Sequence, residues 1–154
     1  MPPSPTPDSD TAEFLRRDTF AREMGIELTE ARDGFAVARL ALSDRHLNGL
    51  GLAHGGAVFT LADLAFAAAA NAGNAVAVAI NANISFVHPG KPGGTLVAIA
   101  QETSRSGRLA TYAVEIRNET GQTAATFQGL AYRKPDRSPE SNRQPEAGAP
   151  ENRP

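Results

Sequence analysis

The order of hydrophobic patterns predicts an α+β fold in which an antiparallel sheet wraps around one long helix. Three observations support this prediction. Residues 55–71 are rich in alanine and leucine and carry a single charge, which is typical of a buried helix. Two segments suited to strands precede this helix and four follow it. Short turns join the later segments, as expected of antiparallel neighbours.

The chain before the long helix divides by composition and periodicity. Its first residues are polar and rich in proline, and we expect them to form a disordered leader. A helix follows, capped by Asp10 or Thr11 and ended by Gly25. Asp33-Gly34 is a tight-turn signal that joins two strands into a hairpin. The predicted leader is residues 1–10 and the helix is residues 11–24. The two strands are residues 26–30 and 35–42, and the glycine-containing loop is residues 43–53.

The chain after the long helix alternates between strands and turns. We expect the first strand to have one face formed by the even-numbered residues from Val76 to Phe86 and another carrying Asn81, Asn83 and Ser85. The region after the last strand is low in apolar residues and should be disordered. The four predicted strands are residues 76–87, 95–103, 109–117 and 123–133. The predicted disordered tail is residues 135–154. One domain therefore spans residues 11–134, a size that can bury a core.

The start of the long helix is a candidate catalytic centre. Gly55 and Gly56 lie where the loop becomes the helix, and the first N–H groups of a helix have no intrahelical partner. Such a start can hold an anion or a developing oxyanion. Asp63 interrupts an apolar run, where a carboxylate is costly unless it is paired or used. Asp63 is either a catalytic acid or a solvent-facing one, with about even weight on this stretch alone.

The sequence carries three blocks in order: Asn-Gly-x-x-x-x-His-Gly-Gly with Leu-Ala-Asp-x-Ala in residues 48–65, Asn-Ile-Ser-Phe and a proline in residues 83–89, and Arg-Ser-Gly-Arg in residues 105–108. Together these blocks resemble those of hotdog-fold acyl-CoA thioesterases. The nearest resemblance is to the phenylacetyl-CoA thioesterases of the phenylacetate degradation pathway, and it covers residues 20–133. The departure is His88, where many relatives carry arginine or another residue before the proline. The matching residues are Asn48, Gly49, His54, Gly55, Gly56, Leu61, Ala62, Asp63 and Ala65, then Asn83, Ile84, Ser85, Phe86 and Pro89, then Arg105, Ser106, Gly107 and Arg108.

The resemblance implies a hotdog fold and hydrolysis of an (aryl)acyl-CoA, phenylacetyl- or hydroxyphenylacetyl-CoA, to the free acid and CoA. The Gly55 N–H would receive the carbonyl oxygen, and Asp63 would act as general base or as nucleophile. The resemblance further implies that Asn48 and His54 position the thioester or the water. Arginine and lysine suit the phosphates of CoA. The substrate- and CoA-binding candidates are Gly56, Asn83, Ser85, Phe86, Lys91, Arg105, Gly107 and Arg108.

The composition of the chain argues against several classes of function. The net charge of −2 argues against a nucleic-acid-binding protein, and no cysteine is present to form a disulfide or act as a nucleophile. The three histidines lack metal-ligand spacing, so we expect no metal and no cofactor apart from CoA as part of the substrate. The longest apolar run is too short to span a bilayer, and a cytoplasmic protein is expected. Two alternatives stay open: a hotdog hydratase or dehydratase, and a non-catalytic acyl-CoA-binding module.

The spacing of Gly55 and Asp63 predicts a shared active site. The two residues are eight positions apart on one helix, which corresponds to roughly 12 Å along its axis. An aspartate side chain does not close that distance. We therefore expect a homodimer with composite sites, in which two antiparallel helices bring Asp63 of one chain to Gly55 of the other, and further assembly to a tetramer.

Overall fold

The computed structural model describes residue 13, residues 16–73 and residues 76–134. The predicted leader, the predicted tail and the cap at Asp10 or Thr11 lie outside these ranges. The predicted domain limits therefore stay a prediction. None of the helices in the described ranges is long and apolar enough to cross a membrane, and the cellular compartment likewise stays a prediction.

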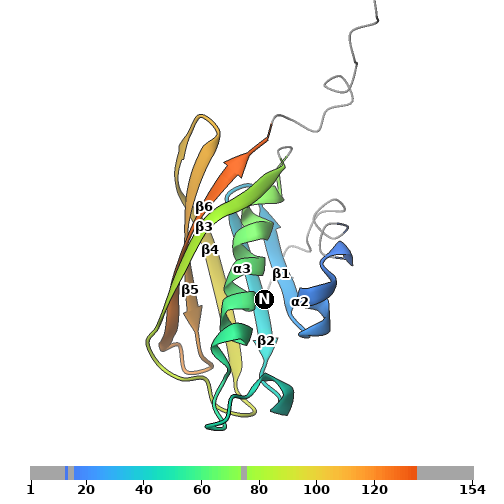
Figure 1. Cartoon of the computed structure of the whole chain (residues 1–154), viewed down its shortest axis with the longest axis vertical. Helices are drawn as coiled ribbons and strands as arrows, with labels where there is room; N and C mark the ends of the chain where they lie inside the picture. The colour runs from blue at the N-terminus through green and yellow to red at the C-terminus, as the bar shows by residue number, and fades with distance from the viewer. Residues whose placement is uncertain (1–12, 14–15, 74–75, 135–154) are drawn as a thin grey trace, which may run out of the picture.

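One antiparallel sheet of six strands curves around a single long helix (Figure 1). The strand order across the sheet is β1-β2-β4-β5-β6-β3, so β1 and β3 are the edge strands. The helix α3, Gly55–Asn71, lies in the concave face and has the predicted bounds. The strands are β1 Glu27–Arg32, β2 Phe35–Ala41, β3 Ala77–Phe86, β4 Thr95–Ser106, β5 Leu109–Arg117 and β6 Thr123–Arg133. This arrangement is the hotdog fold and confirms the predicted fold class.

The core forms between α3 and the inward-facing side chains of the sheet. Small residues let the helix lie close to the strands, since Ala65, Ala68 and Ala69 have no exposed area. A larger side chain lies among these alanines, where the Phe66 ring packs at a tilt on Tyr112 with ring centroids 5.2 Å apart. A Cβ atom on Gly129 would lie 2.7 Å from the Phe66 ring, so only glycine lets the ring approach the sheet here.

The first helix differs from its prediction. The structure has helix α2 at Thr19–Glu23, and Asp18 is its N-cap, because the Asp18 carboxylate accepts a hydrogen bond from the Ala21 N–H at 2.9 Å. The prediction of one continuous helix up to residue 24 is therefore wrong at Asp18, where the capping side chain starts a new helix. Gly25 ends α2 as predicted, in the left-handed conformation with φ of 73°.

Two strand predictions also need correction. A β-bulge between Ala79 and Asn81 shifts the pairing of β3 with β6, so one alternating pattern does not run through the strand. The predicted apolar face holds for Ala82 and Ile84 but fails before the bulge, where Ala77 is buried and Val78 and Ile80 are exposed. Strand β4 continues to Ser106, so the turn predicted at residues 105–107 lies at residues 107–108.

Candidate active site

The start of α3 carries one backbone donor without an acceptor. His54 is the N-cap, and its Nδ1 accepts the Gly56 N–H at 2.8 Å. The His54 carbonyl accepts the N–H groups of Ala57 and Val58 at 2.9 and 3.2 Å. Because a trans peptide is planar, the Gly55 N–H points opposite to this carbonyl and out of the helix start. Within the described ranges the Gly55 N–H donates no hydrogen bond.

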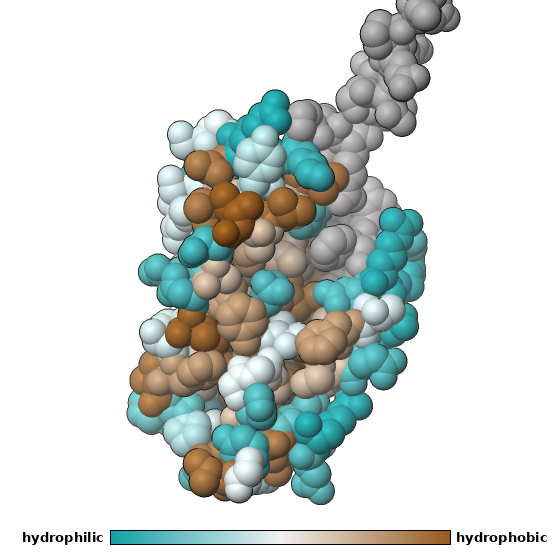
Figure 2. All heavy atoms as spheres, in the orientation of Figure 1, coloured by the Kyte–Doolittle hydropathy of each residue, from teal (hydrophilic) through white to brown (hydrophobic). Residues whose placement is uncertain are grey.

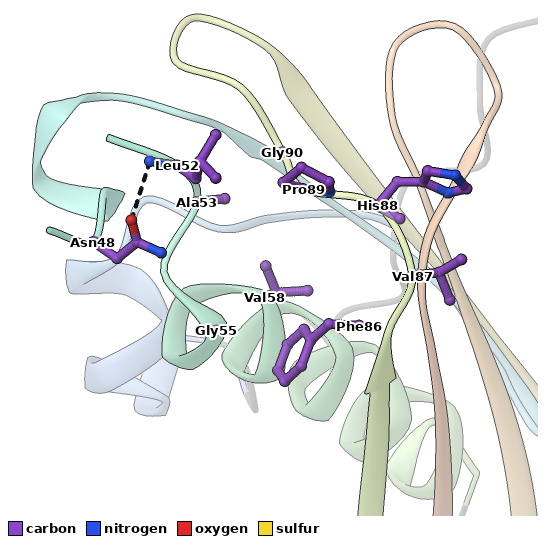
Figure 3. A pocket seen from close by; sticks show the side chains of 11 residues that line it. Asn48, Leu52, Ala53, Gly55, Val58, Phe86, Val87, His88, Pro89 and Gly90 are labelled. Atoms are coloured by element: carbon purple, nitrogen blue, oxygen red, sulfur yellow. Dashed lines mark hydrogen bonds between the residues drawn. The ribbon is translucent and has the colours of Figure 1, made fainter. Parts of the chain in front are cut away.

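A cavity of about 320 Å³ opens beside this donor (Figure 3). Asn48 stands at its rim, where its Oδ1 accepts the N–H groups of Leu50 and Leu52 at 2.9 and 3.2 Å. These two contacts occupy the carbonyl end of the amide, so Asn48 can offer the cavity only its NH₂ group. The other walls are mainly apolar. The lining residues are Asn48, Leu52, Ala53, Gly55, Val58, Phe86, Val87, His88, Pro89, Gly90 and Ala124.

Phe86 stands directly over the Gly55 backbone. A Cβ atom added to Gly55 would lie 3.1 Å from the Cζ of the Phe86 ring. The ring is 58% exposed and forms a wall of the cavity. Glycine at position 55 therefore leaves room between the helix start and the end of the Phe86 ring.

Asp63 is half-buried on α3 and does not line this cavity. Burial raises the pKa of the Asp63 carboxyl above its ordinary value, and the negative charge of Asp18 on the neighbouring helix raises it further. The raised pKa makes the carboxylate a stronger base than a solvated aspartate. Since α3 is an uninterrupted helix from Gly55 to Asn71, Asp63 lies roughly 12 Å along the axis from Gly55 of its own chain.

The predicted binding residues are distributed over several places. Gly55 and Phe86 share the cavity, and Gly56 faces the opposite flank of the same turn, in a hollow that also contains His54. Asn83 and Ser85 pair with Gln128 and Thr126 on the face of the sheet that points away from α3. The structure therefore does not bring these two polar residues to the cavity of their own chain.

The predicted cationic residues also lie apart from the cavity. Lys91 lines an adjoining hollow together with His88, whose Nδ1 bonds the Thr123 carbonyl oxygen and whose ring turns away from the cavity (Figure 3). Arg105, Gly107 and Arg108 lie at or beside the β4–β5 turn, at the end of the sheet away from the start of α3 (Figure 1).

Arg105 is held by two carboxylates. Its guanidinium contacts Glu102 at 2.6 Å and Asp33 at 2.9 Å, and these hydrogen bonds raise the pKa of the Arg105 group above its ordinary value. Arg108 instead donates to the Tyr132 hydroxyl at 3.1 Å. Of the two arginines, Arg108 has the positive charge with no carboxylate partner among the described residues.

Sequence reasoning missed most of the apolar cavity wall. Leu52, Val58 and Ala124 come from a loop, a helix and a strand, and nothing in their local pattern marks them as neighbours. Within the described ranges, no three histidine or acidic side chains are grouped so that they could hold a metal ion.

Exposed apolar side chains lie at both ends of the edge strand β3, and we call them the apolar strip. Val78, Ile80, Phe86 and Val87 are between 43% and 58% exposed. Strand β3 pairs only with β6 among the described strands, so its other edge has no partner there. Figure 2 shows hydrophobic atoms running down the face presented by α3 and β3, with hydrophilic atoms along the flank formed by β1 and α2.

Comparison with known proteins places this geometry in a family. Residues 50–125 match the model of the Thioesterase superfamily. The chain is 39% identical to the acyl-coenzyme A thioesterase PaaI of Escherichia coli over 120 residues, which are 78% of this chain and 86% of that protein. It is 32% identical to a putative esterase of Archaeoglobus fulgidus, over 78% of each chain.

Solved structures agree with the sequence comparison. The structure of E. coli PaaI, from the phenylacetic acid degradation operon, superimposes with a TM-score of 0.78 at 36% identity, over 82% of this chain and 93% of that one. A variant of the phenylacetic acid degradation protein PaaI from Thermus thermophilus gives a TM-score of 0.72 at 36% identity, over 76% of this chain and 100% of that one. The chain belongs to the thioesterase superfamily.

Proposed function

We propose that this protein is an acyl-CoA thioesterase that hydrolyses an aryl-acyl-CoA, such as phenylacetyl- or hydroxyphenylacetyl-CoA, to the free acid and CoA. The observation that carries the proposal is the Gly55 N–H, an oriented donor at a helix start beside an apolar cavity. The relative named acyl-coenzyme A thioesterase PaaI supports the reaction class.

The chemistry follows from the two groups at hand. The thioester carbonyl oxygen accepts the Gly55 N–H, and the helix dipole adds to the stabilisation of the oxyanion as it forms. A carboxylate with raised pKa, that of Asp63, removes a proton from the attacking water or attacks the carbonyl itself. In the general-base route the C–S bond breaks as the tetrahedral intermediate collapses, and the proton held by Asp63 passes to the CoA sulfur, so that the thiol and the carboxylic acid leave. In the nucleophilic route the C–S bond breaks to leave a mixed anhydride on Asp63, and a water then cleaves the anhydride, giving its hydroxyl to the acyl group and a proton to the CoA thiolate. The NH₂ group of Asn48 orients the thioester or the water at the cavity rim.

The acyl group is proposed from the cavity and the relatives. A volume of about 320 Å³ with apolar walls accommodates an aromatic ring. The exposed Phe86 ring, whose end lies beside Gly55, offers an aromatic contact to an aryl group held there. The phenylacetic acid degradation context of the E. coli and Thermus proteins points to the same class.

A hydrolysis panel tests this function. Release of free CoA thiol is measured with phenylacetyl-, hydroxyphenylacetyl-, acetyl-, hexanoyl- and palmitoyl-CoA, for the wild type and for Asp63→Asn. We expect the highest kcat/KM with the aryl substrates and a loss on the order of 10²–10⁴ in the variant. Turnover of crotonyl-CoA by hydration, without thiol release from any substrate, would instead identify a hydratase. Binding of acyl-CoA without turnover would identify a binding module.

We further propose that each active site forms between two chains. Asp63 lies too far along α3 to serve the Gly55 of its own chain. Pairing of two β3 edges across a two-fold axis would cover the apolar strip and set two α3 helices antiparallel. Asp63 of one chain then comes to Gly55 of the partner. The same rotation carries the partner's β4–β5 turn toward this site, where Arg108 would meet the CoA phosphates. A tetramer of such dimers stays a prediction.

Complementation between two inactive variants tests the composite site. Asp63→Asn and Gly55→Pro chains are unfolded and refolded together, so that mixed dimers contain one intact site and one doubly damaged site. Random pairing predicts recovery of roughly a quarter of the wild-type activity. Inactivity of verified mixed dimers would show that Gly55 and Asp63 act within one chain.

A further inference from the structure

Two imidazole or amide side chains are buried among the described residues, His46 and Asn71, with 2% and 9% of their areas exposed. Asn71 lies at the end of α3 and bonds the Ala67 carbonyl and both backbone groups of Ala77, so it joins the helix to β3. His46 lies at the other end, in the short 3₁₀ helix η1, Asp44–His46, before α3. The proposed chemistry uses neither residue.

The contacts of the His46 ring define one protonation state. Nδ1 lies 3.0 Å from the Ser43 backbone nitrogen, which can only donate, so Nδ1 accepts. Nε2 lies 2.8 Å from the Met24 carbonyl oxygen, which can only accept, so Nε2 carries the proton. Arg45 Nε is 3.3 Å from the same Nε2, but this longer contact is no hydrogen bond in that tautomer. The ring is therefore neutral and joins the end of α2 to the turn at Ser43.

The backbone of His46 continues this chain of contacts to the site. Its carbonyl oxygen accepts the His54 N–H at 2.7 Å. The His54 carbonyl is held by the first turn of α3 at its other side, through the Ala57 and Val58 N–H groups. The His54 N–H belongs to the Ala53–His54 peptide plane, and the His54 carbonyl belongs to the His54–Gly55 plane. The planes on both sides of the His54 Cα are therefore held, the first by His46 and the second by the first turn of α3, and the direction of the Gly55 N–H is set with the second plane.

We propose that His46 is a positioning residue for thioester hydrolysis, which holds the Gly55 N–H in line with the carbonyl oxygen of the substrate. This inference rests on the proposed function of Gly55. Buried hydrogen bonds on both ring nitrogens fix the ring, and the ring fixes the main chain that orients His54. A small displacement of an oxyanion donor weakens transition-state binding far more than ground-state binding.

Three variants test the proposal. His46→Leu removes both ring contacts, His46→Gln keeps a donor that reaches the Met24 carbonyl, and Asn71→Leu removes a buried polar side chain at the far end of α3. Initial rates with phenylacetyl-CoA, Tm and the ¹H–¹⁵N resonance of the Gly55 amide are measured for each. We expect His46→Leu to lower kcat about 10- to 100-fold with KM within about threefold. His46→Gln should recover most of that loss, and Asn71→Leu should lower Tm and keep kcat.

Four outcomes would overturn the proposal: a folded His46→Leu variant with wild-type kcat, a glutamine variant no better than leucine, an equal loss of kcat in Asn71→Leu, or an unmoved Gly55 resonance in His46→Leu. If His46→Leu does not fold, His46→Asn replaces it, since the asparagine oxygen can accept from Ser43 while its amide is too short to reach the Met24 carbonyl. If the wild type hydrolyses no acyl-CoA, the proposed function fails. The Gly55 resonance still decides the positioning role, because it should move in His46→Leu and stay in Asn71→Leu.

Discussion

Replacement of Gly55 by proline or by alanine isolates the contribution of one backbone N–H. Gly55 is the first residue of α3, where proline is well tolerated because its missing N–H has no intrahelical acceptor. The preceding residue, His54, has φ of −64° and ψ of 133°, an extended conformation that a following proline favours. The Gly55 N–H also donates to no described residue. Gly55→Pro should therefore delete the donor with little effect on folding.

Alanine is the matched control because both variants add a Cβ atom. That atom would lie 3.1 Å from the end of the Phe86 ring, an exposed side chain that can move by a few tenths of an ångström. Any cost of this contact appears in both variants. The ratio of their kcat values then reports the replacement of the N–H hydrogen by the proline Cδ, and loss of one oxyanion donor predicts a ratio of at least about 10²–10³, or roughly 2.7–4 kcal/mol.

The assay is initial-rate hydrolysis of phenylacetyl-CoA by alanine and proline variants of equal Tm. We expect kcat to fall by this ratio from alanine to proline, with KM changing much less. Equal kcat values in the two variants would refute the assignment of the Gly55 N–H as the oxyanion donor. Phe86→Ala is combined with each Gly55 variant to check the control. Removal of the ring should restore any activity that was lost to the contact with the Cβ atom, and it should not restore the activity that was lost with the N–H.

Three further predictions concern other residues. Asp63→Asn should raise Tm at neutral pH, because the raised pKa of Asp63 means that its charged form weakens the fold. Thermal melts at a series of pH values should show this gain in Tm vanish as the pH falls below the ordinary aspartate range. In wild type, the acid limb of kcat/KM should lie above that of an ordinary aspartate. Arg108→Ala should raise KM for acyl-CoA more than for an acyl thioester of N-acetylcysteamine, whereas Arg117→Ala should change neither. Tyr112→Phe should cost about 1–2 kcal/mol in urea unfolding with kcat unchanged, because it removes the 2.9 Å hydrogen bond to Glu102.

The fold was predictable from the sequence because its main signals are local. The alanine-rich segment gave the bounds of α3, and the Asp33-Gly34 turn signal gave the hairpin that β1 and β2 form. The failures have equally local causes. An aspartate cap divides the first helix at Asp18, and a bulge beside Ala79 changes the facing of β3. Neither feature alters the hydrophobic pattern on which the prediction depended.

The site was predictable only where one segment builds it. The loop and the helix start carried Asn48 and Gly55 together, and the structure places both at one cavity. Arg105 looked like a surface cation in a turn, yet it is held by Glu102 and by Asp33, which is distant in sequence. Long-range pairing of this kind leaves no periodic trace in a single sequence, and the same holds for the cavity wall around Ala124.

The structure gives the two glycines of the His-Gly-Gly sequence different roles, which the sequence alone does not reveal. Both glycine N–H groups at the start of α3 could receive an oxyanion, but the ring of His54 takes the Gly56 N–H for itself. The capping histidine thereby completes the helix start and leaves the Gly55 N–H as the donor that faces the cavity. Because the ring accepts through Nδ1, its proton lies on Nε2, and His54 cannot act as the base in this arrangement without giving up the cap. The base must then come from elsewhere, in agreement with the proposal that assigns this role to the half-buried Asp63.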